Sequence, residues 1–240
     1  MTSSPLDIRR SDERFHTKAG WLDSRHSFSF SRHYDPDNTN HGLLLVLNDD
    51  RVAGGTGFDT HPHRDMEIVT WVLDGELEHK DSKGNRGVIY PGLAQRMSAG
   101  RGIWHSEMNW SPTDQVHFIQ MWVVPDTEST DPGYQQLDIN EQLASGGLVP
   151  VASGQGHDAA ISIQQKDAVL WAARMMPGER IDVPEAAFGH LFIAKGAAEL
   201  EANGRLDSGD AVRLVDQGDM GLVAADEGAE VLIWTTGGLP

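Results

Sequence analysis

Two short pairs of polar side chains constrain the fold of this chain more than any other feature. His61 and His63 stand two residues apart, and His105 and Glu107 repeat that spacing further along the sequence. Side chains at positions i and i+2 project from the same face of a β-strand, so the members of each pair are expected to point together. Two such strands facing each other can enclose one ion. The pairs therefore predict a mononuclear metal site built from imidazoles and a carboxylate.

The residues around these pairs favour strands over helices. The run Glu67–Leu73 is rich in β-branched residues and ends in Asp74-Gly75, a turn signal. Pro62 lies between the two histidines and argues against a helix there. The chain has 26 glycines, 11 prolines and many short β-rich runs, but few long apolar patterns of helical period. We expect an all-β protein with one short helix within residues 132–144.

Composition narrows the chemistry that this chain can perform. It has no cysteine, which excludes disulfides, iron–sulfur clusters and thiol catalysis, so histidine, aspartate or glutamate must hold any metal. There is no run of about 18 apolar residues, and residues 1–5 lack the apolar core of a signal peptide. A cytoplasmic protein without membrane contact is therefore expected. The net charge of −17 repels polyphosphate, so we expect no direct nucleic-acid binding.

A weak internal repeat divides the chain into two halves. Residues 69–78 align with residues 190–199 so that Gly75 falls on Gly196, and each copy continues into a turn. Two related β-barrels in tandem explain this pattern, with chance similarity between glycine-rich hairpins as the alternative. The second copy has no His-x-His pair and no later His-x-Glu pair. Metal chemistry is therefore expected in the first half alone.

Longer motifs around the two pairs resemble those of the cupins. The first motif is Gly55-x5-His61-x-His63-x3-Glu67-x7-Gly75, and the second is Gly100-x-Gly102-x2-His105-x3-Asn109. More narrowly, the chain resembles the pirin family, strongly from about residue 8 to 125 and weakly beyond. The segments that carry this resemblance are Gly20–Ser24, His26–Phe30, Tyr34–Pro36, Thr60–His63, Glu78–His79 with Asp81–Ser82, and Arg96–Glu107.

The resemblance implies an all-β bicupin of two tandem jelly-roll barrels. We expect an N-terminal metal-binding cupin domain at residues 1–130 and a C-terminal cupin-like domain without the site at residues 131–240. Cupins often take their carboxylate ligand from the position of Glu67, whereas pirin-like proteins take it from the position of Glu107. Strand alternation agrees, since Glu107 shares a face with His105. The expected metal ligands are therefore His61, His63, His105 and Glu107.

These ligands leave room on a six-coordinate first-row metal for substrate and dioxygen. Iron(II) is the expected ion, although manganese, cobalt, nickel, copper and zinc accept the same ligands. The resemblance further implies the activity of a quercetinase, which opens the central ring of a flavonol with dioxygen and releases carbon monoxide. Glu107 would then be the catalytic residue that accepts the proton of the flavonol 3-hydroxyl.

A flat aromatic substrate needs an apolar slot, and several side chains near the motifs are candidates for its walls. Each of them could instead belong to the barrel core. The candidates are Phe28, Phe30, Met97, Ile103, Trp104 and Trp122.

The sequence leaves two other functions open. Pirin-like proteins include members that act as metal- or redox-sensing regulators by binding a partner protein, and a small molecule other than a flavonol could be the substrate. A monomer is expected, because a bicupin already buries within one chain an interface that single cupins form as dimers.

Overall fold

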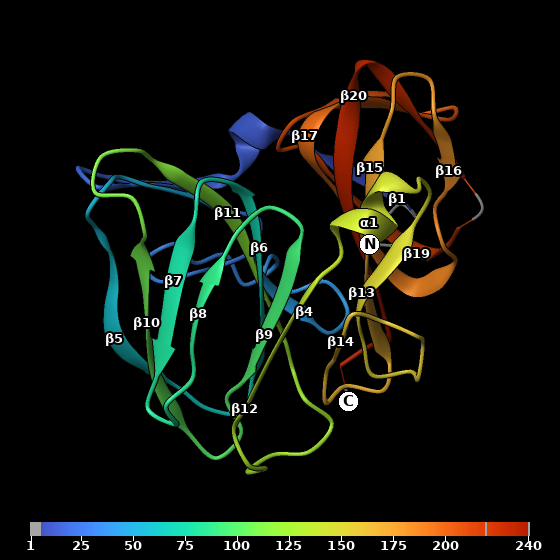
Figure 1. Ribbon diagram of the computed structural model, residues 1–240. Coiled ribbons are helices and arrows are strands. Elements are labelled where there is room, and N and C mark those ends of the chain that lie inside the picture. The colour runs from blue at the N-terminus through green and yellow to red at the C-terminus, as the bar shows by residue number, and fades with distance from the viewer. Residues whose placement is uncertain (1–5, 219, 240) are drawn as a thin grey trace.

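The computed structural model describes residues 6–218 and 220–239, and within them three β-sheets form two barrels (Figure 1). The first barrel, on the left of Figure 1, combines a four-stranded and a seven-stranded sheet. A nine-stranded sheet folds into the second barrel on the right. The expected all-β fold of two tandem cupin barrels is confirmed.

The four-stranded sheet has the order β5-β10-β7-β8, with antiparallel neighbours throughout. Its strands are β5 (Gly57–His63), β10 (Ile103–Asn109), β7 (Leu77–Asp81) and β8 (Arg86–Ile89). The seven-stranded sheet has the order β12-β9-β6-β11-β4-β3-β2. Its strands are β12 (Gly133–Asp138), β9 (Leu93–Ser98), β6 (Glu67–Asp74), β11 (Val116–Val123), β4 (Leu44–Val52), β3 (Leu22–His26) and β2 (Phe15–Ala19).

Two long strands, β17 (Ala186–Leu200) and β20 (Gly221–Thr236), run through the whole second barrel. The first part of β17 pairs with β19, and its last part pairs with β18. Between these two parts, the pairing of β17 with β20 shifts its register. The remaining strands of this sheet are β1 (Leu6–Arg9), β13 (Val149–Ser153), β14 (Ile161–Ser162), β15 (Ala168–Met175), β16 (Arg180–Asp182), β18 (Gly204–Asp207) and β19 (Ala211–Gln217).

Helices are short in the part of the chain that the structure describes. A 3-10 helix, η1, spans Ser11–Glu13, and the α-helix α1 spans Asn140–Ala144. The helix expected within residues 132–144 therefore covers only the end of that stretch. Its beginning, Gly133–Asp138, forms β12 instead, because it pairs along its length with β9. No described helix is long and apolar enough to cross a membrane.

The two barrels exchange strands at their edges. β1, from the start of the chain, pairs with β19 in the sheet of the second barrel. β12, which follows residue 130, pairs with β9 in the first barrel. Each barrel therefore contains one strand from the other side of residue 130, where the boundary between the two domains is expected.

The internal repeat corresponds to a similar corner in each barrel. Gly75 follows β6 with a φ of 76°, and Gly196 lies in the bent part of β17 with a φ of 68°. A Cβ atom on Gly196 would come within 2.0 Å of the carbonyl oxygen of Gly228. Both corners therefore need a residue that accepts a left-handed backbone, and Gly196 must also lack a side chain.

Strand β6 is buried on both of its faces, as expected for a nearly continuous apolar run. Ile68 and Val72 pack into clusters within the first barrel, whereas Val69, Trp71 and Leu73 belong to a cluster shared with the second barrel. That shared cluster includes Phe192 and Trp234 from the second barrel, among others. One face of β6 thus lines the first barrel while the other joins the two barrels.

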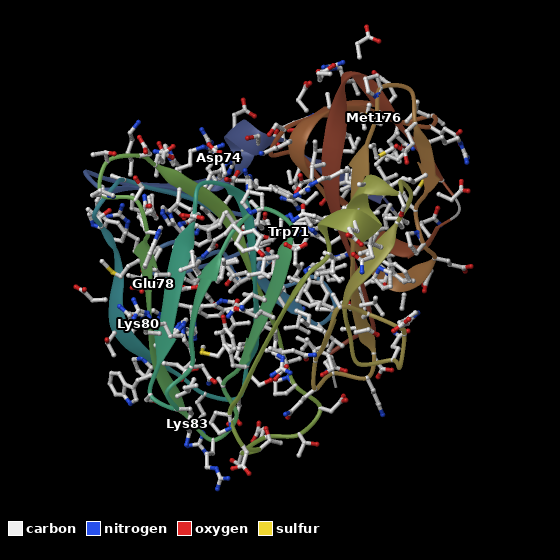
Figure 2. The ribbon with its side chains drawn as sticks, in the orientation of Figure 1. Trp71, Asp74, Glu78, Lys80, Lys83 and Met176 are labelled. Atoms are coloured by element: carbon white, nitrogen blue, oxygen red, sulfur yellow. The ribbon has the colours of Figure 1, made fainter. Side chains whose placement is uncertain are left out.

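Trp71, which Figure 2 labels between the two barrels, forms a hydrogen bond across this junction. Its Nε1 donates a 2.7 Å hydrogen bond to Oε1 of Glu230, whose Oε2 accepts a 3.0 Å bond from Nε of Arg174. The Trp71 side chain is fully buried. The junction therefore combines apolar packing with a charge-assisted hydrogen bond.

We predict that Trp71→Phe lowers the free energy of unfolding by about 2–4 kcal/mol, because it removes buried volume and leaves one oxygen of a buried carboxylate without its donor. Urea denaturation of the purified protein measures this loss. Trp104→Phe, at a side chain that is 53% exposed, serves as the control and should change the free energy by no more than about 0.5 kcal/mol. Equal stabilities for the two variants would contradict this account of the junction.

Candidate metal centre

Antiparallel pairing of β5 with β10 brings three of the predicted ligands together. His105 lies opposite His61, and Ile103 lies opposite His63. The ring centroids are 4.5 Å apart for His61 and His105 and 4.9 Å apart for both His61 with His63 and His63 with His105. One ligand atom from each ring lies within 4.8 Å of the others. The i, i+2 spacing in β5 and the pairing of β5 with β10 therefore bring the three imidazoles together, as expected.

The protonation of these imidazoles suits metal binding. Nδ1 of His61 lies 2.7 Å from the carbonyl oxygen of Asp59, so it must carry the proton and leave Nε2 as the acceptor. Nε2 of His63 and Nε2 of His105 are buried and have no hydrogen-bond partner among the described residues. Burial, the largest cause, lowers the pKa of His63 to about 4 and that of His105 to about 3. Both rings are therefore neutral near pH 7, as metal ligands must be.

His79 and Asp81 of β7 orient the ring of His105. Nε2 of His79 lies 3.4 Å from a carboxylate oxygen of Asp81, and Nδ1 of His79 lies 3.4 Å from Nδ1 of His105. Because the carboxylate can only accept, His79 donates from Nε2 and accepts at Nδ1, so Nδ1 of His105 is the donor. This chain leaves the lone pair of His105 on Nε2, the atom that faces the other two histidines without a protein partner. Metal-ligating histidines commonly donate their second ring N–H to a neighbouring acceptor, which fixes the ring and its tautomer, and Nδ1 of His79 is that acceptor for His105.

Glu107, the fourth predicted ligand, is 2% exposed and fixed by two donors. Oγ1 of Thr70 donates to its Oε1 over 3.3 Å, and Nε2 of Gln120 donates to its Oε2 over 2.6 Å. A register shift in the pairing with β5 falls between His105 and Glu107. Glu107 forms a second group of potential ligands with His79 and His105, also within 4.8 Å of one another. The two groups share His105 and together include all four predicted residues.

Glu67, which occupies the usual cupin carboxylate position, is bound elsewhere. Its Oε2 accepts hydrogen bonds from Oγ of Ser98 at 2.8 Å and from the backbone N–H of Gln164 at 3.1 Å. The side chain is 1% exposed, and burial raises its pKa. Glu67 therefore ties β6 to β9 and to the second half of the chain, and it belongs to neither group of potential ligands.

A cavity of about 490 Å³ opens beside the candidate metal ligands. His61, His63 and Glu107 contribute to its wall, together with the aromatic rings of Phe30, Phe58 and Trp122, among others. The ring of Trp122 stands edge-on to that of His63, with 4.9 Å between the centroids. The cavity therefore offers an aromatic surface next to the candidate ligands.

Only two of the six side chains considered for the substrate slot line this cavity, Phe30 and Trp122. Phe28 packs in the cluster shared by the two barrels, and Met97 and Ile103 pack in a small core cluster. Trp104 is 53% exposed. The barrel-core alternative applies to three of these residues, and proximity to a motif in sequence was a poor guide to the cavity wall.

Sequence reasoning missed the polar part of the wall. Asn48, Asp50, Gln120 and His26 all line the cavity. Asp50 is 3% exposed, and desolvation raises its pKa to about 7. The available signal was an unusual run of polar residues, Asn48-Asp49-Asp50, within a buried strand. Because buried polar groups in a strand need partners or a function, such a run indicates an internal polar surface.

Family comparisons agree with this arrangement of two barrels. A family model described as Pirin matches residues 8–123, and a model described as Quercetinase C-terminal cupin domain matches residues 150–234. The fold and the histidine cluster thus define a bicupin with a candidate metal centre in its first barrel.

Individual relatives narrow the class further. A Mycobacterium tuberculosis protein named "Putative quercetin 2,3-dioxygenase" is 57% identical over 235 residues, covering 98% of this chain and 96% of the relative. Quercetin 2,3-dioxygenase of Escherichia coli K12 is 37% identical over 228 residues, covering 95% and 96%. The crystal structure of the bacterial pirin YhhW from Escherichia coli in complex with nickel(II) has a TM-score of 0.87 and 35% identity, covering 98% and 100%. The chain belongs to the pirin family.

We predict that His105→Ala abolishes stoichiometric metal binding, because it removes the residue common to both groups of potential ligands. His79→Ala should weaken metal affinity about 10- to 100-fold, since the ring of His105 would lose its orienting partner. Elemental analysis and competition with a chelator give these values. His157→Gln, in the second barrel, is the matched control and should bind metal like the unaltered protein. Full occupancy in His105→Ala would rule out this site.

Proposed function

We propose that this protein is a metal-dependent dioxygenase that opens the central ring of a flavonol such as quercetin with dioxygen and releases carbon monoxide. We further propose that His61, His63, His105 and Glu107 hold one divalent transition metal, with iron(II) as the native ion. The main support is that His61, His63 and Glu107, with His105 beside them, border one cavity whose wall also includes the aromatic rings of Phe30, Phe58 and Trp122. The names of the relatives support the same reaction class.

The buried histidine nitrogens carry the argument for a metal. Two Nε2 atoms, those of His63 and His105, are buried beside each other and have no protein partner within residues 6–218 and 220–239. A buried imidazole nitrogen without a partner is costly, and coordination to a metal would satisfy it. When bound, a divalent metal supplies a positive charge that lowers the pKa of a substrate hydroxyl and open positions for small ligands.

Glu107 is the proposed acceptor for the proton of the flavonol 3-hydroxyl. Thr70 and Gln120 hold its two oxygens, and Gln120 is itself held by a 3.2 Å hydrogen bond from Nε1 of Trp122. A carboxylate oxygen has two lone pairs, so each oxygen can accept a further bond. The side chain is thus oriented before substrate arrives, which is what general-base catalysis requires.

The cavity suits a flat aromatic substrate in size and lining. Its volume of about 490 Å³ lies within the range of roughly 300–1,000 Å³ typical of small-molecule sites. Phe30, Phe58 and Trp122 can contact the faces and edges of aromatic rings. The buried polar groups Asn48 and Asp50 stand in the same wall and offer hydrogen bonds to substrate hydroxyls. Aromatic contacts would hold the rings while polar groups select their orientation.

We predict that the metal-loaded protein consumes quercetin under air, with loss of the visible absorbance of quercetin and release of carbon monoxide. Glu107→Gln should lower kcat by about 10²–10⁴, because the amide cannot accept a proton. His61→Ala should abolish turnover together with metal binding. Glu67→Gln is the matched control, since its amide oxygen can still accept the hydrogen bond from Gln164, and it should keep kcat within a few-fold.

Two results would contradict the proposal. Absence of turnover with iron, manganese, cobalt, nickel, copper and zinc, each bound at one equivalent, would exclude flavonol cleavage. Unchanged turnover in both Glu107→Gln and His61→Ala would instead exclude the site, even if the activity itself is real.

A further inference from the structure

A second, smaller cavity lies at the junction of the two barrels and is separate from the metal centre. Its volume is about 140 Å³, under a third of the 490 Å³ of the metal cavity. The N-terminal segment contributes Arg14 to its wall, and the second barrel contributes His190 and Arg213. Ser27 lines it between them, and His26 lines both cavities. The two cavities therefore have the side chain of His26 in common, and the small one is lined by residues far apart in the sequence.

Two buried guanidinium groups dominate this small cavity. Arg14 is 7% exposed and Arg213 is 8% exposed. Nη2 of Arg14 pairs with Asp49 at 2.8 Å, but its Nε and Nη1 are buried and have no acceptor among the described residues. Nη2 of Arg213 bonds the carbonyl oxygen of Ser27 and Oδ1 of Asn38, both neutral groups, while its Nε has no acceptor in the described chain. Arg14 and Arg213 therefore both have buried N–H groups without an acceptor at this cavity.

Further polar groups at the same cavity lack partners. His190 is 1% exposed, and both of its ring nitrogens are without a hydrogen bond to any described residue. Oγ of Ser27 is buried and unpaired in the same way. Leaving a buried polar group unpaired costs about 1–3 kcal/mol, and more for a charged group. So many unpaired donors around one cavity indicate that a further polar species completes the site.

The sign of the local charge indicates an anion. Asp49 is the carboxylate paired with Arg14, and it also accepts hydrogen bonds from His117 and Arg51. Arg213 has no carboxylate within salt-bridge distance among the described residues. Burial lowers its pKa to about 10, so it remains charged near pH 7, and burial keeps the pKa of His190 well below its usual value. Asp7 lies opposite Arg213 in the pairing of β1 with β19, but its carboxylate is paired with Arg9. The inner wall therefore carries a guanidinium that forms no ion pair with a described carboxylate.

The acidic residues of the cavity lie nearer to solvent and are already bound. Glu13 is exposed, and its carboxylate accepts the backbone N–H of Arg10 at 3.1 Å. Asp35 is partly exposed, and its carboxylate accepts the backbone N–H of Asp37 at 3.0 Å. Neither carboxylate is paired with Arg14 or Arg213. Since exposed Arg9 and Glu13 line the cavity, a small ion can reach it from solvent.

We propose that this cavity is a binding site for a small oxyanion, one that carries a carboxylate or a phosphate group, held by Arg14, Arg213, His190 and Ser27. Guanidinium groups match the geometry of both kinds of oxyanion, and a neutral histidine and a hydroxyl each add one donor. The volume suits an ion of this size rather than a polycyclic substrate. Because its ligands come from both barrels, the bound anion stabilises their contact.

Titration of the metal-loaded protein with inorganic phosphate and, separately, with acetate tests the proposal at constant ionic strength set by sodium chloride. We expect one site per chain for at least one of the two anions. At a hundredfold excess over Kd, the anion should raise Tm by about 5 °C or more. A preference for phosphate or for acetate identifies the kind of oxyanion.

Arg213→Met should weaken anion binding at least tenfold, because it removes the charged guanidinium, whose central carbon lies 4.6 Å from the centroid of the Phe28 ring, and keeps an unbranched apolar side chain in its place. Arg180→Met, at an exposed arginine outside the cavity, is the matched control and should bind like the unaltered protein. His105→Ala should also keep the affinity, which separates this site from binding of the anion to the metal.

A crystal of the unaltered protein grown with selenate gives a readout that needs no variant. Selenate mimics phosphate, and its anomalous signal should appear in the small cavity within hydrogen-bonding distance of Arg213 and His190. Three results would overturn the proposal: no stoichiometric binding of either phosphate or acetate, selenate absent from the cavity of a protein that binds phosphate in the titration, or anion binding equally strong in Arg213→Met and the unaltered protein.

Discussion

The antiparallel pairing of β5 with β10 is the interaction on which the candidate centre depends. Alternation along each strand places His61 with His63 and His105 with Glu107, but pairing decides whether the two sets meet. The observed register sets His105 opposite His61. A shift of one residue would send one pair to the other face of the sheet and separate the candidate ligands. The register between β5 and β10 therefore decides whether the four candidate ligands come together.

The surrounding strands contact the candidate ligands from several directions. β7 supplies His79 and Asp81 behind His105, and β6 and β11 supply Thr70 and Gln120 against Glu107. The opposite face of β6 packs on the second barrel through Trp71 and its neighbours. The second barrel thus supports the wall from which the carboxylate is oriented. The second barrel can therefore influence the geometry of the candidate ligands through packing, although it contributes none of them.

Local patterns in the sequence revealed a large part of this structure. The i, i+2 pairs, the turn glycines and the repeat that aligns Gly75 with Gly196 are short-range signals, and each corresponds to a local feature of the fold. The pairing of β12 with β9 and of β1 with β19 joins segments far apart in the chain, so no local pattern predicts it. The prediction of the cavity walls failed for the same reason. Asn48, Asp50 and Gln120 come from two strands whose meeting depends on tertiary structure, and so do Arg14 and Arg213 in the small cavity.

The most direct test of the central claim is a crystal structure of the metal-loaded protein with anomalous diffraction measured at the absorption edge of the bound metal. We expect one anomalous peak in the first barrel, at about 2.0–2.2 Å from Nε2 of His61, His63 and His105 and from one oxygen of Glu107. A peak coordinated by His79 in place of His61 and His63, or located outside the first barrel, would contradict it.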